Sequence, residues 1–245
     1  MSRPLKNLLP LIFAACGATA HADPADYIFS PIVEKGEREI DSKAGIARDR
    51  DGRSFWGGKL GVEYGFTSWW AAEATVNFGR ELGESTRVLS LEWENRFQLT
   101  ETGKHPWDIG LLFEVERERE SSEGYELRYG PLLQMQWGAV QGNLNLLFER
   151  RVGADEPQEP TEFGYQWQLR HHAGGRVDWG AQGFGKLGRW DHWAPRREQS
   201  HILGPALFVK LGDDDDDGEF EAGLLAGTGG AAPKLTLRLQ AMIPF

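Results

Sequence analysis

Hydrophobic and polar residues alternate along most of the chain with a period of two. From Ser54 to Phe66, one face is largely apolar or aromatic, while the other carries glycine and charged residues. A two-residue turn, Thr67–Ser68, leads into a second alternating run, Trp70–Gly79. Because successive side chains of a strand point to opposite faces, this pattern predicts amphipathic β-strands, and the short turn predicts an antiparallel hairpin.

The alternation continues to the end of the chain and predicts about twelve strands. The first and most polar lies within Pro31–Ala47, and the runs after the hairpin are Leu89–Leu99, Trp107–Val115, Tyr125–Trp137, Asn143–Arg151, Phe163–Arg170, the glycine-rich Arg176–Leu187, Leu203–Leu211, Phe220–Ala226 and Leu235–Phe245. Most match the ~9–11 residues with which a tilted strand crosses a bilayer. Strands of a soluble β-sandwich are about half as long, ~5–6 residues.

Aromatic residues gather at the ends of these runs, with aliphatic residues between them. One end collects Tyr64, Phe66, Trp70, Phe97, Trp107, Trp137, Trp179 and Phe245, and the other collects Trp56, Phe78, Tyr125, Phe148 and Phe163. Two aromatic girdles around an aliphatic band are typical of membrane barrels. The pattern therefore predicts an all-β fold, a single antiparallel up-and-down transmembrane β-barrel of about 12 strands. A periplasmic β protein is the alternative.

Residues 1–22 have the pattern of an export signal, with a basic start, a short apolar run and the cleavage site Ala20-His21-Ala22. Cleavage there predicts a signal peptide at 1–22 and a barrel domain at 23–245, in which 23–30 is a short periplasmic N-terminal lead. It would also remove Cys16, the single cysteine of the chain. Lipidation at Cys16 is the alternative reading.

With these features the chain resembles bacterial outer-membrane β-barrel proteins over essentially all of residues 31–245. The hairpin Glu63-Tyr64-Gly65-Phe66-Thr67-Ser68-Trp69-Trp70 and the segment Leu203-Gly204-Pro205-Ala206-Leu207 are similar to uncharacterised proteobacterial porin-like barrels and to small transporters of aromatic-compound degradation. The resemblance implies a location in the cell outer membrane, contact with its lipid and lipopolysaccharide, and insertion by the barrel-assembly machinery. It also implies that Phe245 is the C-terminal assembly signal.

An even number of strands predicts that both termini lie on the periplasmic side. Short turns are expected on that side at Thr67–Ser68, Thr100–Pro106, Val140–Gly142, His172–Gly175 and Gly212–Gly218, and the longest outer loop at Gly188–Gln199. Short periplasmic turns and longer outer loops are typical of this class of barrel.

The polar face of the strands is heavily charged and must point into the lumen, because Arg or Lys facing lipid at mid-depth costs ~2–4 kcal/mol. The candidate lumen-lining residues for selectivity are Glu92, Glu94, Arg96, Glu114, Glu116, Arg128, Arg151 and Arg170. In one reading they pair and fill a narrow barrel, and in the other they line water. Twelve strands lie between the filled eight-stranded and the open sixteen-stranded barrels, so both readings stay open.

The leading functional hypothesis is a narrow porin-like channel for passive passage of small solutes, in which an excess of acids in the lumen would favour cations. A closed barrel with a structural, adhesive or lipid-contacting role is the alternative, and an outer-membrane enzyme is the weaker third. His192 in the segment Trp190–Trp193 is the best enzymatic candidate, since a histidine is a usable base near neutral pH. His201 is in phase with Leu203, so it is expected to point outward.

No G-x-S-x-G sequence, metal-spaced histidine pair or phosphate loop is present in the sequence. We therefore predict no catalytic residues, no metal, no cofactor and no nucleic-acid partner. The run Asp213–Asp217 is unusual and has three readings: a solvated periplasmic turn, a Ca²⁺ ligand set, or a contact for a periplasmic partner. Ordered calcium loops space their ligands around a glycine turn, and this run has no such spacing.

Overall fold

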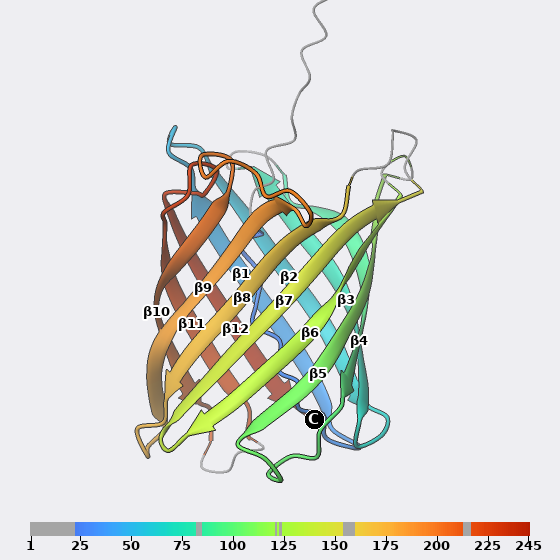
Figure 1. The fold of residues 1–245 in the computed structure, drawn as a ribbon, viewed down its shortest axis with the longest axis vertical. Coiled ribbons are helices and arrows are strands. Elements are labelled where there is room, and N and C mark those ends of the chain that lie inside the picture. Colours follow the sequence, from blue (N-terminus) through green and yellow to red (C-terminus); the bar gives the residue numbers. More distant parts are fainter. Residues whose placement is uncertain (1–22, 82–84, 121, 123, 154–159, 213–216) are drawn as a thin grey trace, which may run out of the picture.

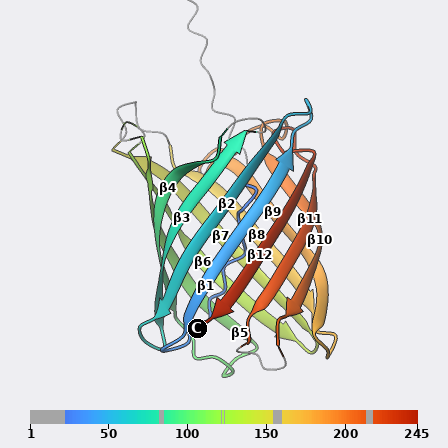
Figure 2. The same ribbon diagram turned by 180° about the vertical axis from the view of Figure 1, so that it is seen from behind.

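The computed structural model describes residues 23–81, 85–120, 122, 124–153, 160–212 and 217–245, and the expected signal peptide and Asp213–Asp216 lie outside these ranges. Its twelve strands pair antiparallel in sequence order, and the first pairs with the last to close a barrel (Figures 1 and 2). They are β1 (Arg38–Arg48), β2 (Ser54–Gly65), β3 (Trp70–Glu81), β4 (Arg87–Gln98), β5 (Trp107–Glu118), β6 (Tyr125–Trp137), β7 (Val140–Val152), β8 (Glu162–His171), β9 (Val177–Arg189), β10 (Ser200–Lys210), β11 (Glu219–Gly227) and β12 (Leu235–Pro244). The predicted all-β, up-and-down barrel of about 12 strands is confirmed. Among the described residues, no helix is long and apolar enough to span a membrane.

The wall of the barrel has its apolar side outward and its polar side inward. On β2, Lys59 is 5% exposed, whereas the neighbouring Leu60 is 49% exposed. The same inversion holds on β4, where Glu92 is buried between the exposed Leu91 and Trp93. A soluble protein would bury the leucines, so this distribution suits a wall that faces lipid.

Aromatic rings form contacts near both ends of the barrel. At the end that carries the C-terminus, Phe66 stacks on Trp70 with 4.6 Å between ring centroids and meets Tyr64 edge-on at 4.8 Å. At the opposite end, Phe148 lies between Tyr129 and Phe163, at 5.8 and 5.2 Å. Each group joins neighbouring strands on the outer wall, as expected for interfacial girdles.

The turn between β6 and β7 differs from the expectation, and the first strand occupies only part of its expected range. The turn between β6 and β7 is at Gly138–Ala139 rather than Val140–Gly142, because Gly138 takes the left-handed conformation (φ 59°) that a tight turn requires. The first strand, Arg38–Arg48, lies within the expected range Pro31–Ala47 except for its last residue. Residues before it contact the inside and the rim of the barrel instead, since the Ile32 carbonyl accepts from Arg96 and the Val33 amide donates to Gln98.

Residues 23–30, expected on the periplasmic side, lie inside the barrel instead (Figures 1 and 2). The chain descends from the mouth beside the β1–β2 connection, opposite the C-terminus, to the rim near the β2–β3 turn. There the Gly36 amide donates to the Gly65 carbonyl at 2.8 Å, and the Gly65 amide donates to the Glu37 carbonyl at 3.0 Å. We call residues 23–33 the lumen segment.

The last residue ends the β1–β12 seam. The Phe245 amide donates to the Arg38 carbonyl at 3.0 Å, and the Phe245 side chain is 65% exposed. Its ring therefore adds little packing within the barrel, and its role as an assembly signal stays a prediction.

We predict that Phe245→Ala reduces the amount of folded barrel in the outer membrane several-fold, because it removes the exposed ring but keeps the backbone hydrogen bond. The measurement is the fraction of heat-modifiable protein on gels of boiled and unboiled membranes. Leu211→Ala, at another exposed apolar position near the same end, is the matched control. Equal folded fractions for both variants would contradict an assembly role for Phe245.

Candidate functional site

The candidate lumen-lining residues are distributed over β4 to β8 and point into the barrel. Glu92, Glu94, Glu114 and Arg128 are buried, and Arg96, Glu116, Arg151 and Arg170 are partly buried. Their ion pairs and hydrogen bonds with other inward side chains place all eight on the inner face of the wall. Their proposed role in selectivity stays a prediction.

The inward carboxylates are matched by cations from the same strand, from adjacent strands and from strands further round the barrel. Lys59 lies 3.0 Å from Glu92, and Arg96 bridges Glu63 and Glu94. Five further pairs join the wall on its inner side: Arg128 with Glu114 (3.4 Å) and Glu149 (3.2 Å), Arg151 with Glu126 (3.3 Å), and Arg170 with Asp178 (2.8 Å) and Glu219 (2.6 Å). Removing one partner of a buried pair leaves an uncompensated charge, so the network stabilises one arrangement of the lumen.

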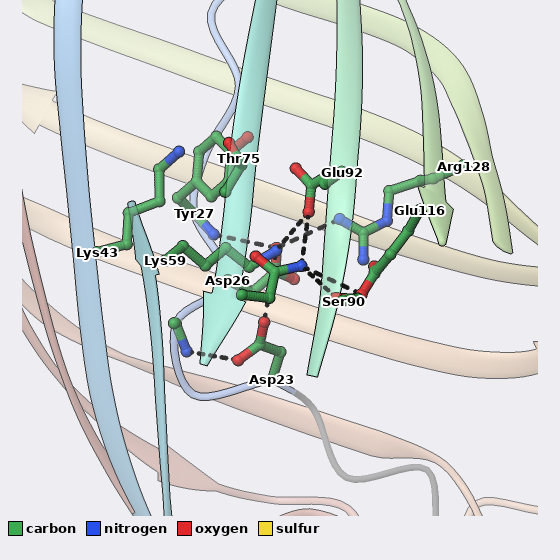
Figure 3. Close-up of polar contacts among 12 residues, drawn as sticks. Asp23, Asp26, Tyr27, Lys43, Lys59, Thr75, Ser90, Glu92, Glu116 and Arg128 are labelled. Atoms are coloured by element: carbon green, nitrogen blue, oxygen red, sulfur yellow. Dashed lines mark hydrogen bonds and ion pairs between the residues drawn. The ribbon is translucent and has the colours of Figure 1, made fainter. Parts of the chain in front are cut away.

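The lumen segment adds its own polar groups to this network (Figure 3). Asp23 lies 3.5 Å from the Lys59 ammonium, and Asp26 accepts a hydrogen bond from Gln166 at 3.0 Å. The Tyr27 hydroxyl donates to Glu94 at 2.5 Å, while its ring covers the Lys43 ammonium, 3.3 Å from the centroid. Tyr27 therefore joins an acid and a base of the wall at once.

Backbone groups of the lumen segment are also bound by the wall. Arg96 donates to the carbonyls of Ser30 and Ile32 at 3.0 and 3.3 Å. Asn145 donates to the Phe29 carbonyl at 3.2 Å, and the Val33 amide donates to Gln98 at 2.8 Å. A chain without strand partners thus has its buried polar groups satisfied by side chains of the barrel.

Two apolar patches on the inner wall receive the apolar residues of the segment. Tyr27 and Phe29 pack together against Leu112, Leu132 and Leu147 from β5, β6 and β7. On the other side, Ile28 packs against a cluster of Phe184, Ile202, Leu225 and Ala232. Burial of these side chains stabilises the segment in its place inside the lumen by the hydrophobic effect.

Small residues on the wall make room for the backbone of the segment. A Cβ on Gly45 would overlap the carbonyl group of Pro24, and a Cβ on Gly110 would lie 3.0 Å from the Cβ of Pro31. Glycine at these two inward positions allows a close approach that alanine would oppose.

The middle of the lumen is filled. Glu94, Glu114, Asn145 and Gln182 face inward, yet each is at most 2% exposed. In an open water-filled channel such side chains would contact water. The structure therefore agrees with the hypothesis in which the inward side chains pair and fill the lumen, rather than line water.

Above the lumen segment the barrel opens into a cavity of about 560 Å³, which we call the vestibule. Asp23 and Pro24 lie at its inner end. Its charged lining comes from the segment, the β1–β2 connection and β3 to β5, and comprises Asp23, Asp49, Arg53, Arg80, Arg87, Glu116 and Glu118. A solute that enters this mouth meets charges of both signs and then the lumen segment.

Two groups of inward carboxylates are close enough to hold a metal ion, namely Glu63, Glu73 and Glu94, and Glu92, Glu114 and Glu116. Each group already faces cations of the protein. Arg96 and Lys43 neutralise the first, and Lys59 and Arg128 neutralise the second. These ammonium and guanidinium groups balance the negative charge of the carboxylates, as a bound metal ion would otherwise do.

His192 and His201 lie apart from the lumen network, whereas His172 contacts its acidic member Asp178. His192 is exposed in the connection 190–199, where the neighbouring Asp191 is paired with Arg189 at 2.9 Å. His201 is bonded to Tyr165 and Gln199 and faces outward, as its phase predicted. His172 lies 2.9 Å from Asp178 at the rim that carries the C-terminus.

The lumen segment was the main feature that the sequence did not place correctly. The strands do carry a sequence pattern that could have predicted it. Three positions whose phase is inward are apolar, namely Leu112, Leu132 and Leu147. Such exceptions indicate something apolar inside the barrel. The apolar run Tyr27-Ile28-Phe29 is the matching part of the segment.

No protein-family model and no curated protein sequence matches the chain. Solved structures do. The COG4313 outer membrane channel from Pseudomonas putida F1 aligns with a TM-score of 0.67 at 11% identity, over 92% of this chain and all of that one. The NanC porin aligns with a TM-score of 0.59 at 11% identity, over 84% of this chain and 98% of that one.

The translocator domain of the autotransporter NalP from Neisseria meningitidis aligns with a TM-score of 0.52 at 14% identity, over 86% of this chain and 89% of that one. The chain has the fold of outer-membrane β-barrels. At these identities the likeness extends to the fold alone, so the role of this barrel has to come from its own lumen.

We predict that Tyr27→Phe loosens the lumen segment. The change leaves a buried carboxylate oxygen of Glu94 without its donor, at a cost of about 1–3 kcal/mol. We expect a cysteine introduced at the buried Ala25 to react roughly tenfold faster or more with a small charged thiol reagent in this background. Tyr64→Phe, which removes a hydroxyl on the outer wall, is the control. An unchanged rate would mean that the Tyr27 hydroxyl does not hold the segment.

Proposed function

We propose that the protein is an outer-membrane channel for small solutes, which the lumen segment holds closed in the arrangement described here. The observation that carries the proposal is the vestibule, which leads from one mouth of the barrel to the segment and ends on it. After the expected cleavage behind Ala22, the segment is covalently joined to the wall only at its lower end, near Gly36. Its upper end is held to the wall by the ion pair of Asp23 with Lys59 at 3.5 Å.

Conduction requires the lumen segment to move out of the lumen. Gly36 is suited to act as the hinge, because it takes a positive φ of 86° and no atom lies near the place where its Cβ would be. The segment can therefore swing down from the lumen while β1 stays paired with β2 and β12. The cost includes exposing Phe29 and the two apolar patches to water, so openings are expected to be rare.

By the same proposal the barrel lies in the outer membrane, with the C-terminus and the β2–β3 turn in the periplasm and the connection 190–199 outside. The exposed apolar wall and the two aromatic girdles support this placement. Lipid, lipopolysaccharide and the barrel-assembly machinery are then its surroundings and partners.

A disulfide that ties the lumen segment to the barrel wall tests both the conduction and the closure by the segment. In the double variant Pro31→Cys with Gly110→Cys, the two Cβ atoms start 3.0 Å apart, within a small shift of the ~3.5–4.5 Å found in disulfides. Cys16 is the only other cysteine of the sequence and precedes the segment. We expect channel openings in planar bilayers for the wild type, at least tenfold fewer for the oxidised variant, and recovery after reduction.

The two single-cysteine variants under the same oxidant are the controls. A locked variant that conducts like the wild type would show that solutes bypass the segment. A closed structural barrel is the competing function, and the filled middle of the lumen favours it. Absence of conductance in the wild type and in the reduced variant, at any voltage, would support that function instead.

We also propose that acidic residues at the vestibule favour cations once the channel is open. Glu116 is the best single test, because it lines the vestibule and accepts hydrogen bonds from Asn77 and Ser90 rather than an ion pair. Glu92, Glu94 and Glu114 are less suitable, because their replacement also breaks buried ion pairs.

We expect Glu116→Gln to move the reversal potential of the open channel toward anions in a salt gradient. Glu101→Gln, in the exposed connection between β4 and β5, is the control and should leave it unchanged. If the two variants have the same reversal potential as the wild type, Glu116 does not contribute to selectivity.

A further inference from the structure

The outer wall carries a groove near the mouth opposite the C-terminus. Its volume is about 360 Å³, and it lies over β8, β9 and β10. Its outward lining combines wall residues of β8 and β10 with polar groups of two connections: Tyr165, Trp167, Arg196, His201, Leu203 and Thr228. The lumen segment and the vestibule are on the other side of the wall.

The groove exists because β9 has no side chains at two successive outward positions. In the strand register, Gly185 lies between Tyr165 and His201, and Gly183 lies between Trp167 and Leu203. A Cβ on Gly183 would overlap the indole of Trp167, and a Cβ on Gly185 would overlap the phenol ring of Tyr165. The two rings therefore lie over β9 and form a flat aromatic floor.

The end of the groove nearer the mouth is polar and is fixed by hydrogen bonds. The Tyr165 hydroxyl and His201 Nδ1 are 2.9 Å apart across Gly185, and His201 Nε2 is 2.9 Å from Gln199 Oε1. The Gln199 amide donates to the Ala194 carbonyl at 2.7 Å. This series of contacts holds the connection 190–199 against the wall, and that connection places Arg196 at the groove.

Arg196 is exposed, and among the described residues it has no ion-pair partner. The adjacent Arg197 differs, since its guanidinium lies 3.1 Å from Glu198. Trp190 and Trp193 in the same connection are more than half exposed, as expected for rings at the level of lipid headgroups. Arg196 is thus an available cation at the depth where lipid phosphates lie.

We infer that this groove binds a phosphate-bearing lipid of the surrounding leaflet. An acyl chain lies along the floor of Trp167 and Leu203, and the phosphate meets the Arg196 guanidinium. Planar guanidinium groups bind phosphate oxygens in pairs, which gives the site its preference for a phosphorylated headgroup. The inference rests on the proposed placement of the connection 190–199 on the outer side of the membrane. It does not depend on whether the barrel conducts, because the groove is on the outer wall.

The test uses the purified full barrel in detergent, with diphosphoryl lipid A as the probe and native mass spectrometry as the readout. We expect one lipid to stay bound to the wild type and Arg196→Gln to weaken its binding about tenfold or more, as for loss of a charge-assisted hydrogen bond. Arg197→Gln, a neighbouring change of the same charge, should bind like the wild type. Equal loss of lipid affinity in both variants would mean that binding depends on the overall surface charge, and it would overturn the proposed site.

Two further measurements distinguish a phosphorylated lipid from an unphosphorylated lipid and from a free phosphate ion as the ligand. Lipid A without phosphates should bind at least tenfold more weakly than the diphosphoryl form, and equal binding would overturn the role of Arg196 as the phosphate ligand. Inorganic phosphate in excess should compete only weakly, because it lacks the chain that covers the aromatic floor. Complete competition at equal concentration would identify an ion site instead of a lipid groove.

Discussion

The space enclosed by twelve strands is the constraint on which the rest of this structure depends. Eight strands enclose a lumen that wall side chains can fill, while sixteen leave a water-filled path. Twelve strands with inward glycines, such as Gly45 and Gly110, leave room for one more stretch of chain. The lumen segment takes that room, and the inner wall is built to receive it.

This constraint explains why the lumen is both charged and filled at its middle. Wall charges alone could pair in several ways, but Tyr27 contacts Glu94 and Lys43 together, and Arg96 binds two carbonyls of the segment. The polar contacts select one position of the segment along the lumen, and the apolar contacts of Phe29 and Ile28 supply burial. Displacing the segment therefore disturbs the ion pairs and the apolar patches at the same time.

The sequence was sufficient to predict the wall of the barrel, because a period of two is a local property. The phase of Lys59 and Leu60, or of Glu92 and Trp93, follows from neighbours in the chain. The expectation for residues 23–30 was wrong because their partners are more than sixty residues away, as in the pairs Tyr27–Glu94 and Asp26–Gln166. Which acid meets which base depends on strand register, and alternation does not determine register across a barrel. The groove over Gly183 and Gly185 was not foreseen for the same reason.

The direction of the lumen segment changes how the ends of this protein relate to the two sides of the membrane. An even strand count normally brings both ends of a barrel chain to one side. Here the backbone crosses the barrel once more before β1, so Asp23 lies at the mouth opposite Phe245. A reporter fused directly before Asp23 would emerge on one face of the barrel while a reporter after Phe245 emerges on the other. In topological terms the described part of the chain, which starts at Asp23, crosses the barrel twelve times as strands and once through the interior.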